Sequence, residues 1–512
     1  MDDAAPMSLR FDFDRFRLRR FIESRIEAGG ITVIDQPVAL IDLAGHMDGK
    51  PDAMLFRQAG PEAAEVVGNV IGDDRLAAAF GVPRERLPHE VMKRLDEPRD
   101  VVEIPSAQAP VHQIVLRGDE ADLTRLPVHL QHGCDGGPYI SSSIDYVIDP
   151  ETGWTNTGCR RLMLRGRRET GIDLVAPSDL RQIYLASAQR GEALPIAFAV
   201  GSHPIDFVAA NMRIPMDELA LTAALRGAAL PVVKCVTSDI RVPADVEMVL
   251  EGTLDARGHV ADEGPYGEFY GYYGQMKQNP VFHLSAITMR RDALFQTTTI
   301  SGRELSCTET ANLGRLRTEI MVWRALQSAV RAPVAVHATT ASNGVNHVRV
   351  AIRQLVPGEA RNAISAVFGC LANVKHVFVV DDDIDVTSDS QIEWALSTRF
   401  QADRDLVVQG GFRTLPLDPS LDGARTGAKA GFDLTLPFGK RDALALRVPA
   451  PPTRGQARFQ TVREALGSGP MMFGELMAAV GSDDGRELVL ELEELRRAGA
   501  LSRLDEGQYA LN

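Results

Sequence analysis

Helical and strand-like patterns of apolar residues alternate through the first hundred positions of the chain. Residues 16–28 place apolar side chains at helical spacing and end at a glycine pair, which predicts an amphipathic helix. The short apolar run 31–34 predicts a buried strand, and the alternation of helix and strand patterns continues through 63–80. We therefore expect an α/β domain over residues 1–110.

After residue 110 the pattern changes to short β-type runs that glycine and proline residues separate. Runs of this kind with frequent turn residues are typical of a β-barrel or a sandwich. We expect one such domain over residues 111–310. Its clearest runs are 139–148, 194–200, 232–236 and 281–289.

An α/β pattern returns over residues 311–448. A helical run at 318–328 is followed by an apolar strand pattern at 348–355, and a second helix and strand follow at 358–368 and 376–380. The last of these strands ends in three aspartates, and polar side chains are common at the carboxyl edge of a sheet. We expect a second α/β domain here.

A proline-rich stretch, 448–454, separates this domain from a small unit at residues 456–512. The pattern of the unit predicts three helices and a tight hairpin, which is the outline of a winged helix. The unit holds six arginines against ten acidic residues, and its third helix carries four glutamates. DNA binding needs a basic surface, so packing or oligomerisation fits the unit better. The predicted helices are 461–466, 473–480 and 486–498, and the predicted hairpin strands are 501–504 and 508–511.

Composition narrows the class of protein. The chain has 512 residues, of which 45% are hydrophobic and 24% are charged, as in ordinary globular proteins. Its formal net charge of −14 argues against a nucleic-acid-binding protein. The five cysteines are scattered and form no CxxC pair, so neither disulfides nor a zinc site is expected. No run approaches the roughly 18 apolar residues of a membrane helix, and the start lacks a secretory pattern, so we expect a soluble cytoplasmic protein with no membrane partner.

The most unusual string is EGPYGE at residues 263–268, which puts two carboxylates in a turn of glycine and proline. Four aromatic residues follow within 269–273. Such surroundings can desolvate a carboxyl group and raise its pKa, which suits a proton donor near neutral pH. Chemistry alone leaves a second interpretation open, namely an exposed acidic turn beside an aromatic cluster.

Three further polar strings are less specific. Asn156 can ligate a hard cation and Arg161 can clamp a carboxylate or phosphate, although turns and surfaces contain the same residue types. Glu218 follows an aspartate at the start of an apolar helix, where acidic residues interact favourably with the helix dipole. Glu247 and Glu251 fit the polar positions of an edge strand.

The motifs of several large enzyme classes are missing from the sequence. It contains no HExxH, no GxSxG-type serine near a histidine, no GxxxxGK[ST] loop and no GxGxxG after a strand. Zinc hydrolases, serine hydrolases, ATP-driven enzymes and Rossmann-type dinucleotide enzymes are therefore disfavoured.

Taken in order, five strings resemble the UbiD family of reversible decarboxylases, which use prenylated FMN. The resemblance runs from about residue 18 to residue 447. Order and spacing carry the match, because any one string alone is weak. The strings are W-x-N-x-G-x-x-R at 154–161, VPA-x-x-E-x-VLEG at 242–252, EGP-[YF]-GE-x-x-GYY at 263–273, VKHVFVVDDDID at 374–385 and K-x-G-x-D-x-T at 429–435.

The resemblance implies a multidomain α/β fold: an N-terminal α/β unit, a central flavin-reductase-like split β-barrel that binds prenylated FMN, and a C-terminal α/β domain, with the winged-helix-like unit as an appendage. It implies a catalytic network of Arg161, Glu263 and Glu268, in which Glu268 is the proton donor. The implied metal ligands are Asn156, Asp179 and Glu218. The implied cofactor-binding residues are Asn156, Thr157, Gly158, Cys159, Arg160, Arg161, Ser178, Asp179, Glu218 and Lys375.

One implied metal ligand departs from the family pattern. Some members have a histidine before an L/I-R-Q-I helix, where this chain has Asp179. An aspartate could still hold Mn²⁺ or Mg²⁺, but it adds negative charge beside a phosphate, and it could equally cap the helix that follows. The sequence leaves its role open.

The resemblance also implies a reaction and its partners. A family member would reversibly decarboxylate an aromatic, heteroaromatic or α,β-unsaturated acid through a covalent adduct with prenylated FMN. Mn²⁺ or Mg²⁺, with K⁺ as a further candidate ion, would accompany the cofactor, and a separate flavin prenyltransferase would supply it. The partners would be the small carboxylic acid and CO₂, and the enzyme would be a homo-oligomer. Two alternatives stay open: a non-catalytic flavin-binding protein, and a ligand-sensing regulator that uses the winged-helix-like unit.

Overall fold

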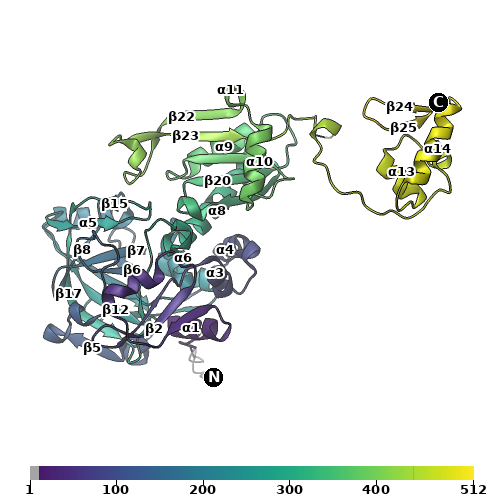
Figure 1. Ribbon diagram of the computed structural model, residues 1–512. Coiled ribbons are helices and arrows are strands. Elements are labelled where there is room, and N and C mark those ends of the chain that lie inside the picture. Colours follow the sequence, from purple (N-terminus) through teal and green to yellow (C-terminus); the bar gives the residue numbers. More distant parts are fainter. Residues whose placement is uncertain (1–10, 442) are drawn as a thin grey trace, which may run out of the picture. The chain divides into compact units, whose positions relative to one another are not determined.

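The computed structural model describes residues 11–441 and 443–512, and the chain separates into two compact units. The first unit ends at Thr435, and the second, Leu436–Asn512, contains the small helical unit at the C-terminal end of the chain (Figure 1). Within the described residues, every helix is too short or too polar to cross a membrane. All five cysteines lie in the described part of the chain and are unpaired, as the sequence predicted.

A four-stranded sheet in the order β1-β2-β3-β18 forms the centre of the N-terminal domain. Leu18 and Ile22 of helix α1 pack with Leu55 and Val67 of this sheet in a small apolar core. The first predicted helix and strand are confirmed, and β1 has the predicted bounds. The elements are α1 (Leu18–Glu27), β1 (Ile31–Ile34), α2 (Leu43–Met47), β2 (Ala53–Ala59), β3 (Ala64–Gly68), α3 (Asp73–Phe80), α4 (Leu87–Leu95) and, from further along the chain, β18 (Phe295–Gln296).

Six strands close into a barrel in the order β12-β9-β6-β7-β8-β17, because β17 pairs with β12 as well as with β8. Phe198 and Phe282 lie in its core, with their rings edge to face at 5.0 Å. The predicted β-barrel is confirmed, and β6, β9 and β17 have the predicted bounds (Figure 1). The strands of this sheet are β5 (Ile114–Arg117), β6 (Tyr139–Ile148), β7 (Thr155–Leu164), β8 (Glu169–Ile172), β9 (Leu194–Val200), β12 (Met248–Leu254) and β17 (Val281–Met289).

Helices and short sheets inserted between the barrel strands carry many of the polar residues discussed below. Strands β4, β10 and β11 form a small sheet, and β13 with β16 and β14 with β15 form two short hairpins. The elements are α5 (Asp179–Gln189), α6 (Pro204–Asn211), α7 (Glu218–Arg226), β4 (Val101–Glu103), β10 (Leu230–Lys234), β11 (Arg241–Pro243), β13 (Ala261–Glu263), β14 (Tyr266–Gly267), β15 (Tyr273–Gly274) and β16 (Lys277–Asn279).

Glu247 and Glu251 are buried, so their interpretation as polar positions of an edge strand is wrong. Strand β12 has a partner on both sides and is not an edge strand. Glu247 accepts hydrogen bonds from Nε and Nη2 of Arg17 at 3.0 and 3.2 Å. Glu251 accepts from the backbone N of Thr237 at 2.9 Å. Both carboxylates fasten neighbouring segments to the barrel.

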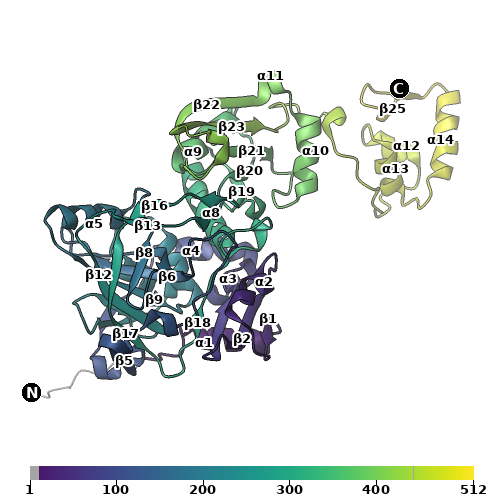
Figure 2. The ribbon, with the colours of Figure 1, turned by 60° about the vertical axis from the view of Figure 1, so that its left-hand side comes forward.

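A five-stranded sheet in the order β19-β20-β21-β23-β22 forms the C-terminal α/β domain. One face packs Val348 and Val377 under α9, and the other packs Ala351 and Val380 under α10 (Figure 2). Helix α8 begins at Glu309, earlier than the sequence predicted. The elements are α8 (Glu309–Ala329), β19 (Pro333–Ala338), β20 (His347–Ile352), α9 (Glu359–Cys370), β21 (His376–Asp381), α10 (Asp389–Arg399), α11 (Ala402–Asp405), β22 (Leu406–Arg413) and β23 (Thr426–Asp433).

The second compact unit contains the three helices and the hairpin that the sequence predicted. Leu476, Leu488 and Leu492 lie in an apolar core of its own. On α14, Val489 and Leu490 are 55% and 63% exposed. An acidic helix with exposed apolar side chains does not suit a DNA groove, so packing against protein stays the prediction for this unit. The elements are α12 (Val462–Gly467), α13 (Phe473–Val480), α14 (Arg486–Arg497), β24 (Leu501–Arg503) and β25 (Tyr509–Leu511).

Candidate active site

Arg161 of β7 lies at the centre of a buried cluster of charges. Its Nε lies 3.1 Å from Oε1 of Glu263, and its Nη1 lies 3.0 Å from both carboxylate oxygens of Glu268. Its Nη2 donates to Oδ2 of Asp173 at 3.0 Å. The structure brings together the three residues that the resemblance implied as catalytic, and it adds a carboxylate that sequence reasoning missed.

Strand pairing places these groups beside one another. Strand β7 pairs with β8, and Asp173 follows the last residue of β8. Strand β13 pairs with β16, which puts Lys277 opposite Glu263. Nζ of Lys277 lies 3.0 Å from Oδ2 of Asp173 and 3.7 Å from Oε1 of Glu268. Arg161 and Lys277 together therefore hold the three carboxylates.

Burial and the two cations set the proton affinity of Glu268. Its side chain is 6% exposed, and this burial raises the pKa of Glu268 although Arg161 and Lys277 oppose the rise. Burial acts in the same direction at Asp173, but the charges of Arg161 and Lys277 outweigh it and lower the pKa of Asp173. A proton donor must hold its proton near neutral pH, so Glu268 suits that role better than Asp173.

Tyr266, inside the EGPYGE string, is the aromatic residue that covers the cluster. The guanidinium carbon of Arg161 lies 4.3 Å from the centre of the Tyr266 ring, and Tyr139 packs on the same ring. Tyr272 and Tyr273, after the string, are 61% and 46% exposed. The expectation that the aromatic run after the string desolvates the carboxylates is wrong for these two tyrosines, because their side chains face solvent.

Asp135 holds the loop that carries Glu268. Its side chain is fully buried, and its Oδ1 accepts from the backbone N of Gly267 at 2.9 Å. Its Oδ2 accepts from the backbone N of His132 at 2.9 Å. Because Gly267 directly precedes Glu268, Asp135 is a positioning residue for the proton donor. The only sequence signal for it is an aspartate in a glycine-rich turn, which most proteins contain.

Glu218 and the start of β7 form a second polar cluster. The backbone N of Thr157 and Nδ2 of Asn156 both donate to Oε2 of Glu218, the latter at 3.3 Å. Asp217, not Glu218, caps α7, because its Oδ1 accepts two backbone N–H groups of the first turn. Burial raises the pKa of Glu218 to about 7, against the hydrogen bonds from Thr157. The carboxylate of Glu218 is therefore directed at β7 instead of the helix start.

Asp179 is the first residue of α5 and does not cap this helix. Ser178 is the N-cap, and its Oγ accepts from a backbone N of the first turn at 3.2 Å. The alternative role of Asp179 as the cap is therefore wrong. Its negative charge helps to raise the pKa of Glu218, so the two carboxylates are close enough to interact.

The implied metal site depends on an amide beside two carboxylates. In the described part of the chain, no three His, Cys, Asp or Glu side chains gather into a metal site. The implied set of Asn156, Asp179 and Glu218 offers only oxygen ligands from its carboxylates and its amide, and these are the ligands that Mn²⁺ and Mg²⁺ prefer. The chemistry of the set therefore fits a hard cation.

Several buried polar atoms around this cluster have no hydrogen-bond partner in the described residues. Oγ1 of Thr155 and Oγ1 of Thr157 are such atoms. Neither carboxylate oxygen of Asp145 accepts a hydrogen bond, although Oδ1 lies 3.1 Å from Nε of Arg160. A Cβ at Gly158 would lie 3.2 Å from the guanidinium of Arg160, so only glycine leaves the backbone open here. Unsatisfied buried oxygens fit a site that binds a cation and a polar ligand.

Two arginines without a carboxylate partner lie near this cluster, and sequence reasoning missed them. Burial and the charge of Arg213 lower the pKa of Arg317 to about 10. Nη1 of Arg317 donates to the backbone and side-chain oxygens of Asn211 at 3.4 and 3.5 Å, and among the described residues no carboxylate pairs with either arginine. Burial raises the pKa of the neighbouring Cys159 to about 12, so this thiol is neutral. Unpaired guanidinium groups at this place fit an anion such as a phosphate.

Lys375 has its contacts in the C-terminal α/β domain. Its Nζ donates to Oδ2 of Asp418 and to Oγ of Ser420, both at 2.7 Å. Its backbone N donates to the carbonyl of Asn346, whose side chain accepts from the hydroxyl of Tyr270 at 2.6 Å. Tyr270 belongs to the loop that follows Glu268, so Lys375 is linked to the active-site loop but does not join the barrel cluster. Its contact with a phosphate stays a prediction.

The cluster around Arg161 has the chemistry to hold an acid and to move one proton. A buried guanidinium binds a carboxylate through two parallel hydrogen bonds. A carboxyl group of raised pKa beside it can supply a proton to the carbon that loses CO₂. A closed barrel with such a cluster defines a carboxylate-binding acid–base site, which is the kind of site that a decarboxylase needs.

Comparisons with known proteins identify the family. Residues 102–304 match the family model of the 3-octaprenyl-4-hydroxybenzoate carboxy-lyase Rift-related domain, and residues 311–434 match that of the C-terminal domain of the same carboxy-lyase. The chain belongs to the UbiD family, and it is a carboxy-lyase. Membership favours the enzyme over the non-catalytic flavin-binding protein and the ligand-sensing regulator.

Relatives and solved structures agree with this assignment. The anhydromevalonate phosphate decarboxylase of Methanosarcina mazei is 32% identical over 422 residues, which cover 81% of this chain and 95% of the relative. The enzyme of the same name from Aeropyrum pernix is 31% identical, over 81% of this chain and 93% of the relative. The UbiD-class enzyme HmfF from Pelotomaculum thermopropionicum, solved with FMN, has a TM-score of 0.79 at 31% identity, over 85% of this chain and 97% of that one. The 3,4-dihydroxybenzoic acid decarboxylase AroY of Klebsiella pneumoniae has a TM-score of 0.78 at 26% identity, over 86% and 98% of the two chains.

Proposed function

We propose that this enzyme reversibly decarboxylates an aromatic, heteroaromatic or α,β-unsaturated carboxylic acid, with prenylated FMN as its cofactor. The observation that carries the proposal is the buried cluster in which Arg161 contacts both Glu263 and Glu268. The flavin is supported by HmfF, whose structures contain FMN and prenylated FMN. The unsatisfied oxygens on β7 and the unpaired Arg317 support a phosphate and a cation at the barrel.

The residues of the chain supply binding, orientation and a proton. Glu263, which is fully buried, fixes the Nε side of Arg161, and Nη1 is shared with Glu268. A substrate carboxylate competes with Glu268 for Nη1 and displaces it. Once Glu268 has lost that partner, its burial favours the protonated form, and it donates the proton to the carbon from which CO₂ departs. Prenylated FMN supplies the electron sink that amino-acid side chains lack.

The experiment that tests this proposal starts from the full chain coexpressed with a flavin prenyltransferase. We expect the mass and the absorption spectrum of the released ligand to identify prenylated FMN, with stoichiometric Mn²⁺ beside it. The loaded protein should release CO₂ from at least one acid of a panel. Ordinary FMN or no flavin on folded protein would overturn the cofactor, and the absence of CO₂ release from every acid would overturn the reaction.

The names of the relatives set the first acids of the panel. Anhydromevalonate phosphate and 3,4-dihydroxybenzoic acid come first, because enzymes similar to this chain are named for their decarboxylation. We also propose a homo-oligomer, which light scattering of the holoenzyme tests directly. HmfF has been solved in an evolved dimeric form.

Glu218→Gln should weaken the retention of Mn²⁺ and of flavin at least about 10-fold, because it removes a carboxylate from the implied ligand set. The measurements are the metal content by mass spectrometry and the flavin content by absorption after gel filtration. Glu192→Gln, at a glutamate whose side chain is 60% exposed, is the matched control. Unchanged metal and flavin in Glu218→Gln would contradict its role as a ligand. Asp179→Asn, measured in the same way, decides whether Asp179 also binds the metal.

Asp135→Asn should lower kcat about 10-fold, since a hydrogen bond to a charged group is worth about 1.5–3 kcal/mol and an amide cannot replace both bonds of the carboxylate. The measurement is kcat divided by the amount of bound flavin, because a purely structural defect would reduce the amount of loaded enzyme and leave this quotient unchanged. Asp119→Asn, at an exposed aspartate, is the matched control. An unaltered quotient in Asp135→Asn would remove Asp135 from the positioning role.

A further inference from the structure

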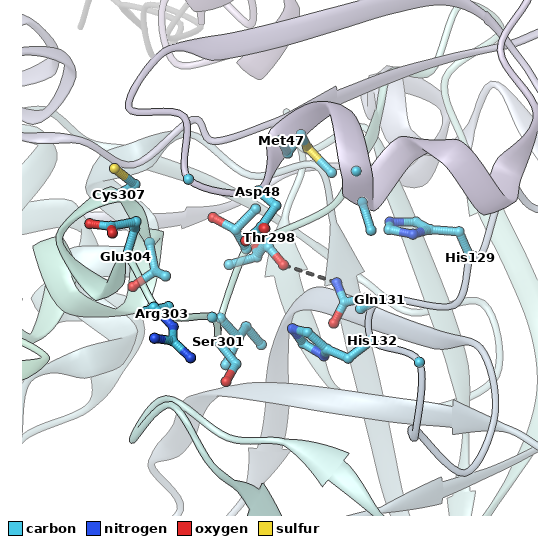
Figure 3. Close-up of a pocket in the computed structure, with 18 residues that line it drawn as sticks. Met47, Asp48, His129, Gln131, His132, Thr298, Ser301, Arg303, Glu304 and Cys307 are labelled. Carbon is cyan, nitrogen blue, oxygen red and sulfur yellow. Dashed lines mark hydrogen bonds between the residues drawn. The ribbon is translucent and has the colours of Figure 1, made fainter.

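A polar cavity of about 340 Å³ lies on the far side of Tyr266 from the catalytic cluster (Figure 3). Helix α2 of the N-terminal domain lines one part of it, residues 298–308 line a second part, and residues 129–133 line a third. The cavity is thus formed by segments that the resemblance and the catalytic cluster did not involve.

Tyr266 connects this cavity with the catalytic cluster. Its ring packs on Arg161 and lies edge-on to His132 at 6.0 Å, and its hydroxyl donates to Oε1 of Gln131. His132 and Gln131 both line the cavity. An acid whose carboxylate binds Arg161 can therefore extend its distal end past Tyr266 into this space.

Two polar groups of the cavity wall have no partner in the described residues. Thr298 is 7% exposed, and its buried Oγ1 forms no hydrogen bond there. Arg303 lines the cavity and, within the described chain, has neither an ion pair nor a hydrogen bond. A buried hydroxyl is normally hydrogen-bonded, so the open Oγ1 indicates a polar ligand. A free guanidinium suits the oxygens of a carboxylate or a phosphate.

The acidic residues of the cavity lie apart from this guanidinium. Asp48 and Glu304 also line the cavity, but Figure 3 shows the guanidinium of Arg303 directed away from both, on the side where Ser301 and His132 lie. That side offers a guanidinium, a hydroxyl and an imidazole to a ligand. An anionic group therefore has a favourable place at Arg303, and the two carboxylates disfavour it on the opposite side.

We propose that this cavity binds a second anionic group of the substrate, distal to the carboxylate that leaves as CO₂, and that Arg303 recognises this group. The inference rests on the proposed decarboxylase function and defines the class of acid: a small unsaturated acid with a phosphate or a second carboxylate at its far end. Arg303 is then a specificity-determining residue, and the reacting atoms lie elsewhere, at Arg161 and Glu268.

The test compares two α,β-unsaturated acids that differ only at the distal end, where one carries a phosphate and the other a hydroxyl. With the holoenzyme, kcat/KM should be higher for the phosphorylated acid. Arg303→Gln should lower the ratio of the two kcat/KM values about 10- to 100-fold, through KM more than through kcat. Glu304→Gln should raise the same ratio, because it removes a negative charge from the cavity. Arg125→Gln, at an exposed arginine outside the cavity, is the matched control.

Two results would overturn the subsite: an equal loss for both acids in Arg303→Gln, or a lower ratio in Glu304→Gln. Calorimetry with the saturated, unreactive analogues of the two acids decides the question even without turnover. Tighter binding of the phosphorylated analogue that Arg303→Gln abolishes supports the subsite, and equal binding of the two analogues refutes it. A holoenzyme that shows this binding difference but decarboxylates neither acid contradicts the proposed function alone.

Discussion

Glu268→Gln should lower kcat by at least about 1000-fold while the protein keeps its cofactor, because general acid catalysis contributes about 10²- to 10⁴-fold and glutamine has no acidic proton. Glutamine keeps the shape of the side chain and one acceptor for Nη1 of Arg161. The neighbouring Asp173 is a poor replacement, since Arg161 and Lys277 lower its pKa. The measurement is the rate of CO₂ release in a single turnover, with the flavin content determined on the same sample.

Glu151→Gln, at an exposed glutamate in the turn before β7, is the matched control for Glu268→Gln. A kcat within about tenfold of the wild-type value would assign the proton donor elsewhere. The pH profile adds a second readout. A donor acts in its protonated form, so kcat should fall as the pH rises through the raised pKa of Glu268. The residual rate of Glu268→Gln should lack this alkaline limb.

The boundaries of the fold could be predicted where apolar runs are regular, and buried polar residues explain where they could not. Strands β6, β9 and β17 have the predicted bounds because turn residues flank each apolar run. Helix α8 begins earlier than predicted, because its buried face includes Glu309, Asn312 and Arg315. A search for apolar periodicity assigns such residues to the exposed face, so it detects only the second half of the helix.

The catalytic residues could be identified from the sequence, whereas the residues that hold them could not. Arg161, Glu263 and Glu268 lie in strings whose order and spacing are specific to a family. Asp173 and Lys277 reach the cluster only through the pairing of β7 with β8 and of β13 with β16. Strand register decides such contacts, and no local pattern reports it.

The cluster couples substrate binding to the protonation of Glu268. Nη1 of Arg161 contacts both carboxylate oxygens of Glu268, so the charge of Arg161 favours the deprotonated carboxylate in the free enzyme. A substrate carboxylate that takes over this guanidinium removes part of that stabilisation and adds a negative charge nearby. Both effects raise the pKa of Glu268 at the moment when its proton is needed.

Arg161→Gln should therefore impair both catalysis and folding. We expect kcat/KM to fall at least about 1000-fold, because the substrate clamp and the cation beside Glu268 are both lost. Leaving buried carboxylates without their partner typically costs about 3–5 kcal/mol in the free energy of unfolding. Without Arg161 the pKa of Glu268 rises further above its unfolded value, and a group of this kind stabilises the fold only while it is protonated. The loss of stability should thus be largest at neutral and alkaline pH and should shrink as the pH falls, which denaturant titrations over a pH series measure.

Two further variants separate the charge of Arg161 from its geometry. Arg161→Lys keeps the positive charge but not the planar fork, so it should recover much of the stability and little of kcat/KM. Arg167→Gln removes a guanidinium whose side chain is 79% exposed, and it controls for the loss of one positive charge. Wild-type activity in Arg161→Lys would show that a point charge suffices for the substrate carboxylate. The two-point clamp would then be wrong, and the fixed orientation of Arg161 by Glu263 would have no part in catalysis.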